Sequence, residues 1–140
     1  MQQRATKIIP GLHKLSYVER LQMLKLPTLV YRRLRGDMIE VYKILHHIYD
    51  PEVTKNLLPS ASSHNLRGNT LKIYHQQCNS SIRHNFFALR VAKPWNSLPD
   101  YVCMAPSVNS FKSRLDSHLE RQELVYNYRS PLSYSSVTLE

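Results

Sequence analysis

The sequence predicts a mostly α-helical fold with one small β-hairpin, in which helices pack around an aromatic core and part of the chain is loop. Apolar residues recur every three or four positions in 29–49 and 107–121, which is the spacing of one helix face. The single tryptophan, Trp95, lies between these stretches, and a small domain tends to centre its core on its few aromatic side chains. One short stretch, 71–75, instead alternates apolar and polar residues, as a half-buried strand does.

The first two predicted helices each begin at a capping residue. Ser16 and Glu19 form a capping box, in which each side chain accepts a hydrogen bond from the other's backbone N–H. This helix is expected to continue until Pro27 stops it, and Thr28 can cap the next. That second helix, at about 29–49, is the longest predicted element. Its inward stripe comprises Leu34, Met38, Val41, Leu45 and Ile48.

Inside the longest helix, two features carry specific expectations. Arg33 and Asp37 are four residues apart, so they are predicted to form an ion pair on the exposed face. Gly36 costs about 1 kcal/mol relative to alanine in a helix interior. It is therefore predicted to mark either a local break of the helix or the close approach of another backbone.

The second half of the chain combines loop, hairpin and helix. Residues 51–70 are rich in turn residues and are predicted to form a loop. The stretch 71–75 is predicted to pair with a second strand at about 82–87, which makes the hairpin. Pro94 stands in an otherwise helical approach to Trp95 and is expected to kink or restart that helix.

The last predicted helix, 107–121, completes one domain. Ser107 is its cap, and Phe111 on its apolar face is expected to share a core with Trp95. The domain is expected to be a single basic helical unit at 1–124. Residues 125–140 are rich in Ser and Tyr and are expected to form a flexible tail.

The net charge of the chain is +9 and is unevenly distributed. Residues 1–50 carry 9 Lys and Arg against 4 Asp and Glu, residues 51–105 carry 6 against 2, and residues 106–140 carry 4 against 4. A basic body favours RNA or DNA as the partner, because phosphates that it neutralises release counterions. The candidate contacts are Arg32, Arg33, Arg35, Lys43, Arg83, Arg90 and Lys93. The alternative is that these side chains lie in solvent or form ion pairs.

Catalytic and metal-binding patterns are weak in this sequence. Four possible zinc ligands lie near one another: His64, His75, Cys78 and His84. They lack the paired spacing of structural zinc sites, so no metal is expected. Acidic residues are scattered singly, whereas two-metal phosphoryl chemistry needs clustered carboxylates, and there is no Gly-rich phosphate loop. We therefore expect no enzymatic activity, no cofactor and no small-molecule substrate.

Cysteine usage and hydropathy indicate where such a protein resides. Its two cysteines, Cys78 and Cys103, are far apart in the sequence and do not form a secreted disulfide framework. No apolar run approaches the roughly 18 residues of a membrane span. An intracellular protein, nuclear or cytoplasmic and without membrane contact, is expected.

Four sequence blocks occur in a recognisable order. They are RATKIIPGLHKLSYVERLQMLKLPTLVYRRLRGDMIEVYKIL from Arg4, Arg67-Gly68 with Leu71-Lys72-Ile73, FFALRVAKPWNSLP from Phe86, and APSVNSFKSRLDSHL from Ala105. Together they resemble the C-terminal end of the reverse transcriptases encoded by non-LTR (LINE-type) retrotransposons of animals. The chain departs from that family at Lys25, where the family often has Gly, and at Pro94.

The resemblance implies a detached, non-catalytic part of such a polymerase, from the thumb and beyond. The family's paired catalytic aspartates lie upstream of this region, and the cysteine-rich zinc knuckle of some members has no counterpart here. In the family, the rest of the polymerase polyprotein is the partner. The expected function is therefore non-specific nucleic-acid binding through phosphates. The alternative is a structural or protein-interaction helical module, either decayed or domesticated, without a nucleic-acid role; an exposed apolar patch would favour it.

Overall fold

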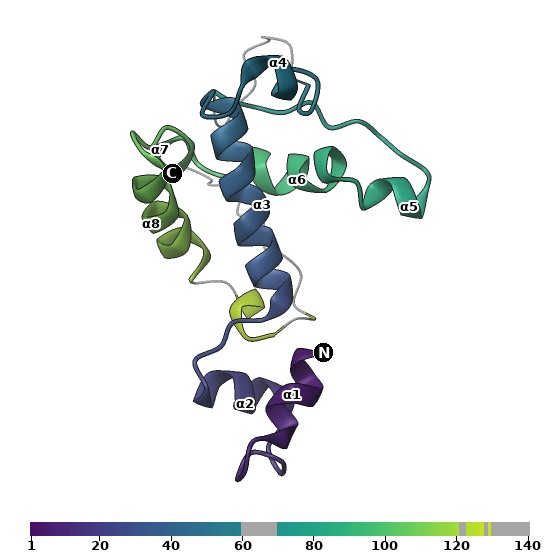
Figure 1. Ribbon diagram of the computed structural model, residues 1–140, viewed down its shortest axis with the longest axis vertical. Coiled ribbons are helices and arrows are strands. Elements are labelled where there is room, and N and C mark those ends of the chain that lie inside the picture. Colours follow the sequence, from purple (N-terminus) through teal and green to yellow (C-terminus); the bar gives the residue numbers. More distant parts are fainter. Residues whose placement is uncertain (60–69, 121–122, 128, 130–140) are drawn as a thin grey trace, which may run out of the picture.

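The computed structural model describes residues 1–59, 70–120, 123–127 and 129 of the chain (Figure 1). Within these residues the regular secondary structure is helical and no sheet forms, so the mostly helical fold class is confirmed. The helices are α1 (Gln2–Ile8), α2 (Tyr17–Met23), α3 (Leu29–Leu45), α4 (Pro51–Thr54), α5 (Ser81–His84), α6 (Phe87–Asn96), α7 (Asp100–Cys103), α8 (Val108–Leu119) and the 3-10 helix η1 (Glu123–Val125).

The fold is built around α3, which runs through the middle of the molecule (Figure 1). Helices α6 and α8 pack against α3, and α7 packs against α8. Helices α1 and α2 pack against each other at the end where α3 begins, apart from α6 and α8 (Figure 1). The described part of the chain therefore contains a three-helix core and an N-terminal helical hairpin, which we call the α1–α2 hairpin.

An aromatic cluster fills the space between α3, α6 and α8. Trp95 and Phe111 are fully buried, and their ring centroids lie 6.0 Å apart. Tyr42 stacks on Phe111 at 4.4 Å and donates its hydroxyl hydrogen to the carbonyl oxygen of Ala105 at 2.6 Å. Aromatic pairs at such distances stabilise a core by more than their buried area alone. The predicted shared core of Trp95 and Phe111 is confirmed.

The predicted caps form at the starts of α2, α3 and α8. Glu19 donates its backbone N–H to the Ser16 hydroxyl at 3.3 Å, while its carboxylate accepts the Ser16 N–H at 2.7 Å. The bonds from Ser16 lower the pKa of Glu19. Thr28 and Ser107 each accept the N–H three residues further along. Because these caps satisfy N–H groups that the helix itself leaves without partners, they set where each helix begins.

Two helices end earlier than predicted, each just before a residue in the left-handed region. Helix α2 stops short of the proline, and Lys25 has a φ of 50°. Helix α3 stops before His47, which has a φ of 53°. Ile48, predicted to continue the inward stripe, is consequently 53% exposed. Apolar spacing does not show where a chain adopts such a turn, because the turn depends on the residues after the last helical turn and on their contacts.

Helix α3 passes through Gly36 without a break. No neighbouring element comes within 4 Å of the position that a Cβ of this residue would occupy. Both sequence interpretations of Gly36, a break or a close approach, are therefore wrong. The residue lowers the helix propensity of α3, and no packing contact explains it.

The predicted β-hairpin is wrong. Residues 82–84 belong to α5 and Phe87 begins α6, while 71–75 lie against α6 with no partner strand among the described residues. The Asn96 side chain accepts the N–H of Ile73 at 2.9 Å and donates to its carbonyl at 2.8 Å, as a neighbouring strand would. Trp95 also donates its indole N–H to the carbonyl of Leu71 at 2.7 Å. The alternating pattern correctly indicates a buried face, which Ile73 occupies. It does not show which groups form hydrogen bonds with the backbone of this stretch.

The structure also differs from the predictions for residues 51–70 and for Pro94. Residues 51–54 of the predicted loop form α4, which Asp50 caps, and 60–69 lie outside the described residues. Helix α6 runs through Pro94 and does not restart there, although proline offers no N–H to the carbonyl four residues earlier. Of the predicted tail, 128 and 130–140 lie outside the described residues. The carbonyl of Val125 accepts the backbone N–H of Thr28 at 2.8 Å.

Candidate nucleic-acid interface

The seven cations predicted to contact nucleic acid fall into two groups. Three of them form ion pairs within the chain: Arg35, Lys43 and Arg90. The other four are exposed: Arg32, Arg33, Arg83 and Lys93. A phosphate contact requires donors that solvent can reach, so the second group is the one available to a polyanion.

Arg35 and Arg90 connect helices. Arg35 on α3 binds both carboxylate oxygens of Asp116 on α8, at 2.5 and 2.8 Å. Arg90 on α6 binds both oxygens of Asp37 on α3, each at 2.9 Å. These hydrogen bonds raise the pKa of both arginines above their usual range. Asp37 therefore pairs with Arg90 of another helix. The prediction of an ion pair between Arg33 and Asp37 is wrong.

Lys43 is held on α3 by two neighbours. Its ammonium lies 2.8 Å from the Glu40 carboxylate and donates to the Tyr49 hydroxyl at 3.2 Å. The bond to Glu40 raises the pKa of Lys43, and the bond from Lys43 lowers the pKa of Glu40. The charge of this lysine is therefore balanced locally.

Two of the exposed cations, Arg83 and Lys93, line adjoining grooves at the α5–α6 end of the fold. The first, which we call the α5 groove, has a volume of about 660 Å³ and is lined by Arg83, Tyr74 and Phe86 among others. The second, the α6 groove, has a volume of about 410 Å³ and includes Lys93 and His75. Both grooves share Gln76 and Leu89 in their linings, so they lie next to each other. Among the described residues that line them there is no carboxylate.

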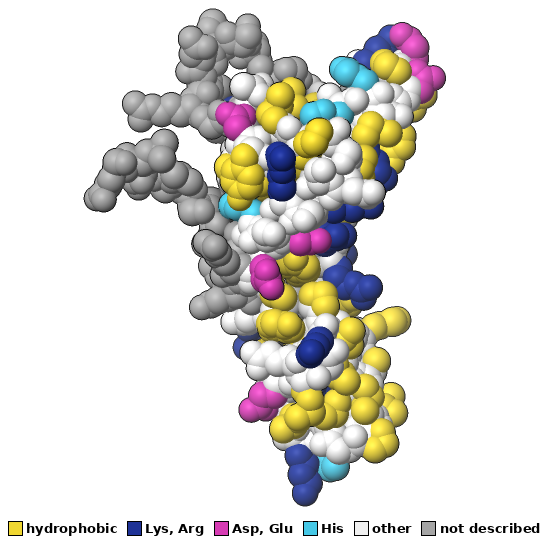
Figure 2. All heavy atoms as spheres, turned by 90° about the vertical axis from the view of Figure 1, so that its left-hand side faces the viewer, with side chains coloured by type: hydrophobic (Ala, Val, Ile, Leu, Met, Phe, Trp, Pro, Cys, Tyr) yellow, Lys and Arg dark blue, Asp and Glu magenta, His cyan; other side chains and the backbone are white. Residues whose placement is uncertain are grey.

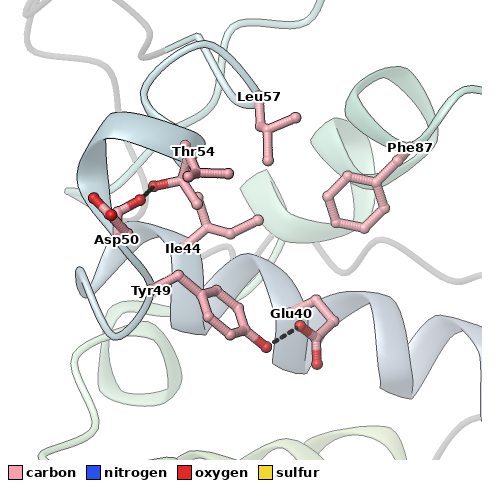
Figure 3. A pocket seen from close by; sticks show the side chains of 8 residues that line it. Glu40, Ile44, Tyr49, Asp50, Thr54, Leu57 and Phe87 are labelled. Atoms are coloured by element: carbon pink, nitrogen blue, oxygen red, sulfur yellow. Dashed lines mark hydrogen bonds between the residues drawn. The ribbon is translucent and has the colours of Figure 1, made fainter.

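A third depression has the opposite electrostatic character. It has a volume of about 540 Å³ and lies between the end of α3, α4 and the start of α6 (Figure 3). Figure 3 shows Tyr49 at its edge, with the hydroxyl donating to Glu40 at 2.6 Å. Its described lining includes Glu40 and Asp50 and no lysine or arginine. Glu40 already pairs with Lys43, so the described lining offers no free cation to a phosphate and this depression does not suit a polyanion.

Arg32 and Arg33 form a second exposed basic site on α3. They are consecutive, so their side chains leave the helix in directions about 100° apart. Neither side chain forms a hydrogen bond or ion pair with another of the described residues. Figure 2 shows Lys and Arg side chains gathered along one edge of the molecule at mid-height. Hydrophobic side chains instead gather over the lower end, where Figure 1 places α1 and α2.

The structure also bears on metal and membrane binding. Within the residues that the structure describes, no three His, Cys, Asp or Glu side chains come together as a metal site would require. His64 and the side chain of His84 lie outside that description. No helix in the described ranges is long and apolar enough to cross a bilayer.

Sequence reasoning selected cations and missed the aromatic side chains beside them. Tyr74 is 56% exposed and Phe86 is 71% exposed, and both line the α5 groove. The alternation in 71–75 places Tyr74 on the face opposite Ile73, so its exposure was predictable. No local pattern distinguishes Phe86 from Phe87, which packs against the core.

A scan against protein-family models and searches of curated proteins and of solved structures find no match for this chain. Its function must therefore be inferred from the geometry of its own residues.

Proposed function

We propose that this chain is a non-catalytic module that binds single-stranded RNA or DNA through phosphates, without reading base sequence. One observation carries the proposal: two adjoining grooves contain Arg83 and Lys93 and no carboxylate among their described lining residues. Phosphate contacts position a strand and carry no sequence information. Binding of this kind follows the backbone, so affinity is expected to be weak and similar for all sequences.

The resemblance to LINE-type reverse transcriptases supports the same function. A basic module beyond a polymerase thumb meets a template or target strand, and the rest of that polymerase would be its protein partner. The setting would then be inside the cell, in the nucleus or the cytoplasm. We also propose that the chain belongs to this polymerase family.

Salt-dependent binding tests the proposal. A labelled oligonucleotide of about 12 nucleotides is long enough for a site of this size. Its affinity for the protein should fall as salt rises, with a slope of about −0.7 per phosphate contacted. The double variant Arg83→Gln/Lys93→Gln should bind more weakly to every sequence and flatten that slope by about 1.4. Fluorescence anisotropy across a salt series measures both quantities.

A matched control separates local contact from overall charge. Arg4 and Lys7 are exposed on α1, so Arg4→Gln/Lys7→Gln removes the same two charges away from the grooves. This control variant should keep most of the dependence of affinity on salt concentration. Equal losses in both double variants would show that only net charge matters, and affinity that ignores salt would overturn the proposal. Arg35 and Arg90 stay unchanged, because their loss would leave Asp116 or Asp37 without its partner.

One observation favours the alternative of a protein-interaction module. The α1–α2 hairpin and the start of α3 expose several large apolar side chains: Ile8, Ile9, Met23, Leu26, Leu29 and Val30. A contiguous apolar patch on a folded protein marks a contact surface more often than an isolated exposed leucine does. If Arg83→Gln/Lys93→Gln binds the oligonucleotide as tightly as the parent does, the result would favour this alternative.

A further inference from the structure

The α5 groove contains more than phosphate binding requires. Tyr74 and Phe86 line it with 56% and 71% of their surface exposed. Exposing a phenylalanine ring to water is unfavourable, at about 25 cal/mol per Å² of apolar surface. Ile82, which lines the same groove, is 83% exposed. An occupant with a flat apolar face would therefore gain free energy by covering this surface.

The cation and the amides of the groove restrict what that occupant can be. Arg83 is exposed within the groove, and its guanidinium can stack on a ring or bind a phosphate. Asn56 and Gln76 offer amide donors and acceptors along the same surface. The described lining has no carboxylate, so a cationic ligand finds no partner there while an anionic one does. The volume of about 660 Å³ lies within the range of about 300–1,000 Å³ typical of small-molecule sites.

The adjoining α6 groove explains why the ring would belong to a polymer. It adjoins the α5 groove, with which it shares the lining residues Gln76 and Leu89, and it carries Lys93 and His75. A strand with a base in the first groove can therefore place its next phosphate near the ammonium of Lys93. Alternation of a stacking surface with cations is how proteins bind single strands independently of sequence.

We propose that Tyr74 and Phe86 form a stacking site for an unpaired base in the α5 groove, with Arg83 and Lys93 holding the adjacent phosphates. This inference rests on the proposed nucleic-acid function and specifies it further. Bases in a duplex have their faces covered by neighbouring pairs and cannot enter such a site. The chain should therefore prefer single strands over a duplex of the same length and salt conditions.

Two oligonucleotides with identical phosphates separate stacking from charge. One is a thymidine strand of about 12 nucleotides, and the other is its abasic analogue, which keeps the backbone but has no bases. The double variant Tyr74→Leu/Phe86→Leu should bind the thymidine strand at least about fivefold more weakly, since one stacked base contributes about 1–3 kcal/mol. It should bind the abasic strand as the parent does, with an unchanged salt slope.

The control variant is Tyr101→Leu. Tyr101 is also 56% exposed, but it lies on α7, away from both grooves. It should leave both affinities unchanged. The emission of Trp95, which is fully buried, verifies that every variant is folded.

A fluorescence measurement observes the stacking directly. In Phe86→Trp, the new tryptophan should be quenched by the thymidine strand and not by the abasic strand, while buried Trp95 in the parent is quenched by neither. Equal affinity of parent and double variant for the thymidine strand, or equal quenching by both strands, would overturn the stacking site and leave phosphate binding standing. Absence of salt-dependent binding to either strand would overturn the proposed function itself.

Discussion

The α1–α2 hairpin and the α3–α6–α8 core are stabilised in different ways. The core buries aromatic and aliphatic side chains, with Trp95 and Phe111 fully removed from solvent. In the hairpin, the buried side chains include Arg20, which is 5% exposed and donates to Thr6 Oγ1 at 3.3 Å. Its guanidinium also donates to the carbonyl of Leu15. A buried charge satisfied by carbonyls fixes geometry but contributes less net stability than apolar packing.

The two regions meet at the start of α3. Gln2 donates its side-chain amide to the carbonyl of Pro27 at 3.1 Å. The adjacent Thr28 is fully buried, and its hydroxyl donates to the carbonyl of Leu124 at 2.8 Å. Thr28 thus closes the core against η1, while Gln2 attaches the hairpin through a single described hydrogen bond to Pro27. Helical content alone therefore does not distinguish a stable core from an appended unit.

The largest expected effect is in the core. Phe111→Ala should lower the free energy of unfolding by about 3–5 kcal/mol, because it removes a fully buried ring between Tyr42 and Trp95. Leu21→Ala in α2 also empties a fully buried position, but Leu21 lies outside the core cluster. It should increase hydrogen exchange in α2 and leave the core transition in place. Urea unfolding followed by Trp95 emission measures the core, and amide exchange measures α2.

Equal shifts of the Trp95 transition in these two variants would contradict the separation of the regions. The chain would then unfold as one cooperative unit. Met23→Ala, at a position 65% exposed on α2, is the control for the substitution itself and should change neither measurement.

An intermediate effect is expected at the caps. Thr28→Val keeps the side-chain shape but removes the α3 cap and leaves the buried Leu124 carbonyl without its donor, at a cost of about 1–3 kcal/mol. Ser16→Ala removes the matching cap of α2 at an exposed site and should affect only the hairpin. Circular dichroism with Trp95 emission compares them. Thr28→Ser should recover most of the loss, and failure to do so would indicate that the methyl packing matters more than the hydroxyl.

The smallest effects on stability are expected from removing one glycine in α3 and introducing another after α2. Gly36→Ala in α3 should stabilise the protein by up to about 1 kcal/mol, because the space for a Cβ is open. Lys25→Gly after α2 should also stabilise it, by about 1 kcal/mol, because its φ of 50° disfavours a side chain. The Gly36 change should raise the core's thermal midpoint, and the Lys25 change should slow amide exchange in the hairpin. Destabilisation by Lys25→Gly would mean that the lysine side chain contributes more than the backbone strain costs.

Local chemistry in the sequence determined the helix starts and the central apolar faces. The caps at Ser16, Thr28 and Ser107 act on N–H groups within three residues, so no distant contact is needed to place them. The spacing of Phe111, Leu115 and Leu119 likewise determines one buried face of α8.

Tertiary structure alone decided which charges and which chain segments found partners. Asp37 pairs with Arg90, which is 53 residues away, although Arg33 is closer in sequence. Asn96 takes the place of a strand beside Ile73, which no alternation of apolar residues can reveal. The same holds for the grooves, because the partial burial of Phe87 and the exposure of Phe86 depend on where α3 lies. Long-range pairing is decided by the packing of whole helices, and a local pattern contains only one side of each pair.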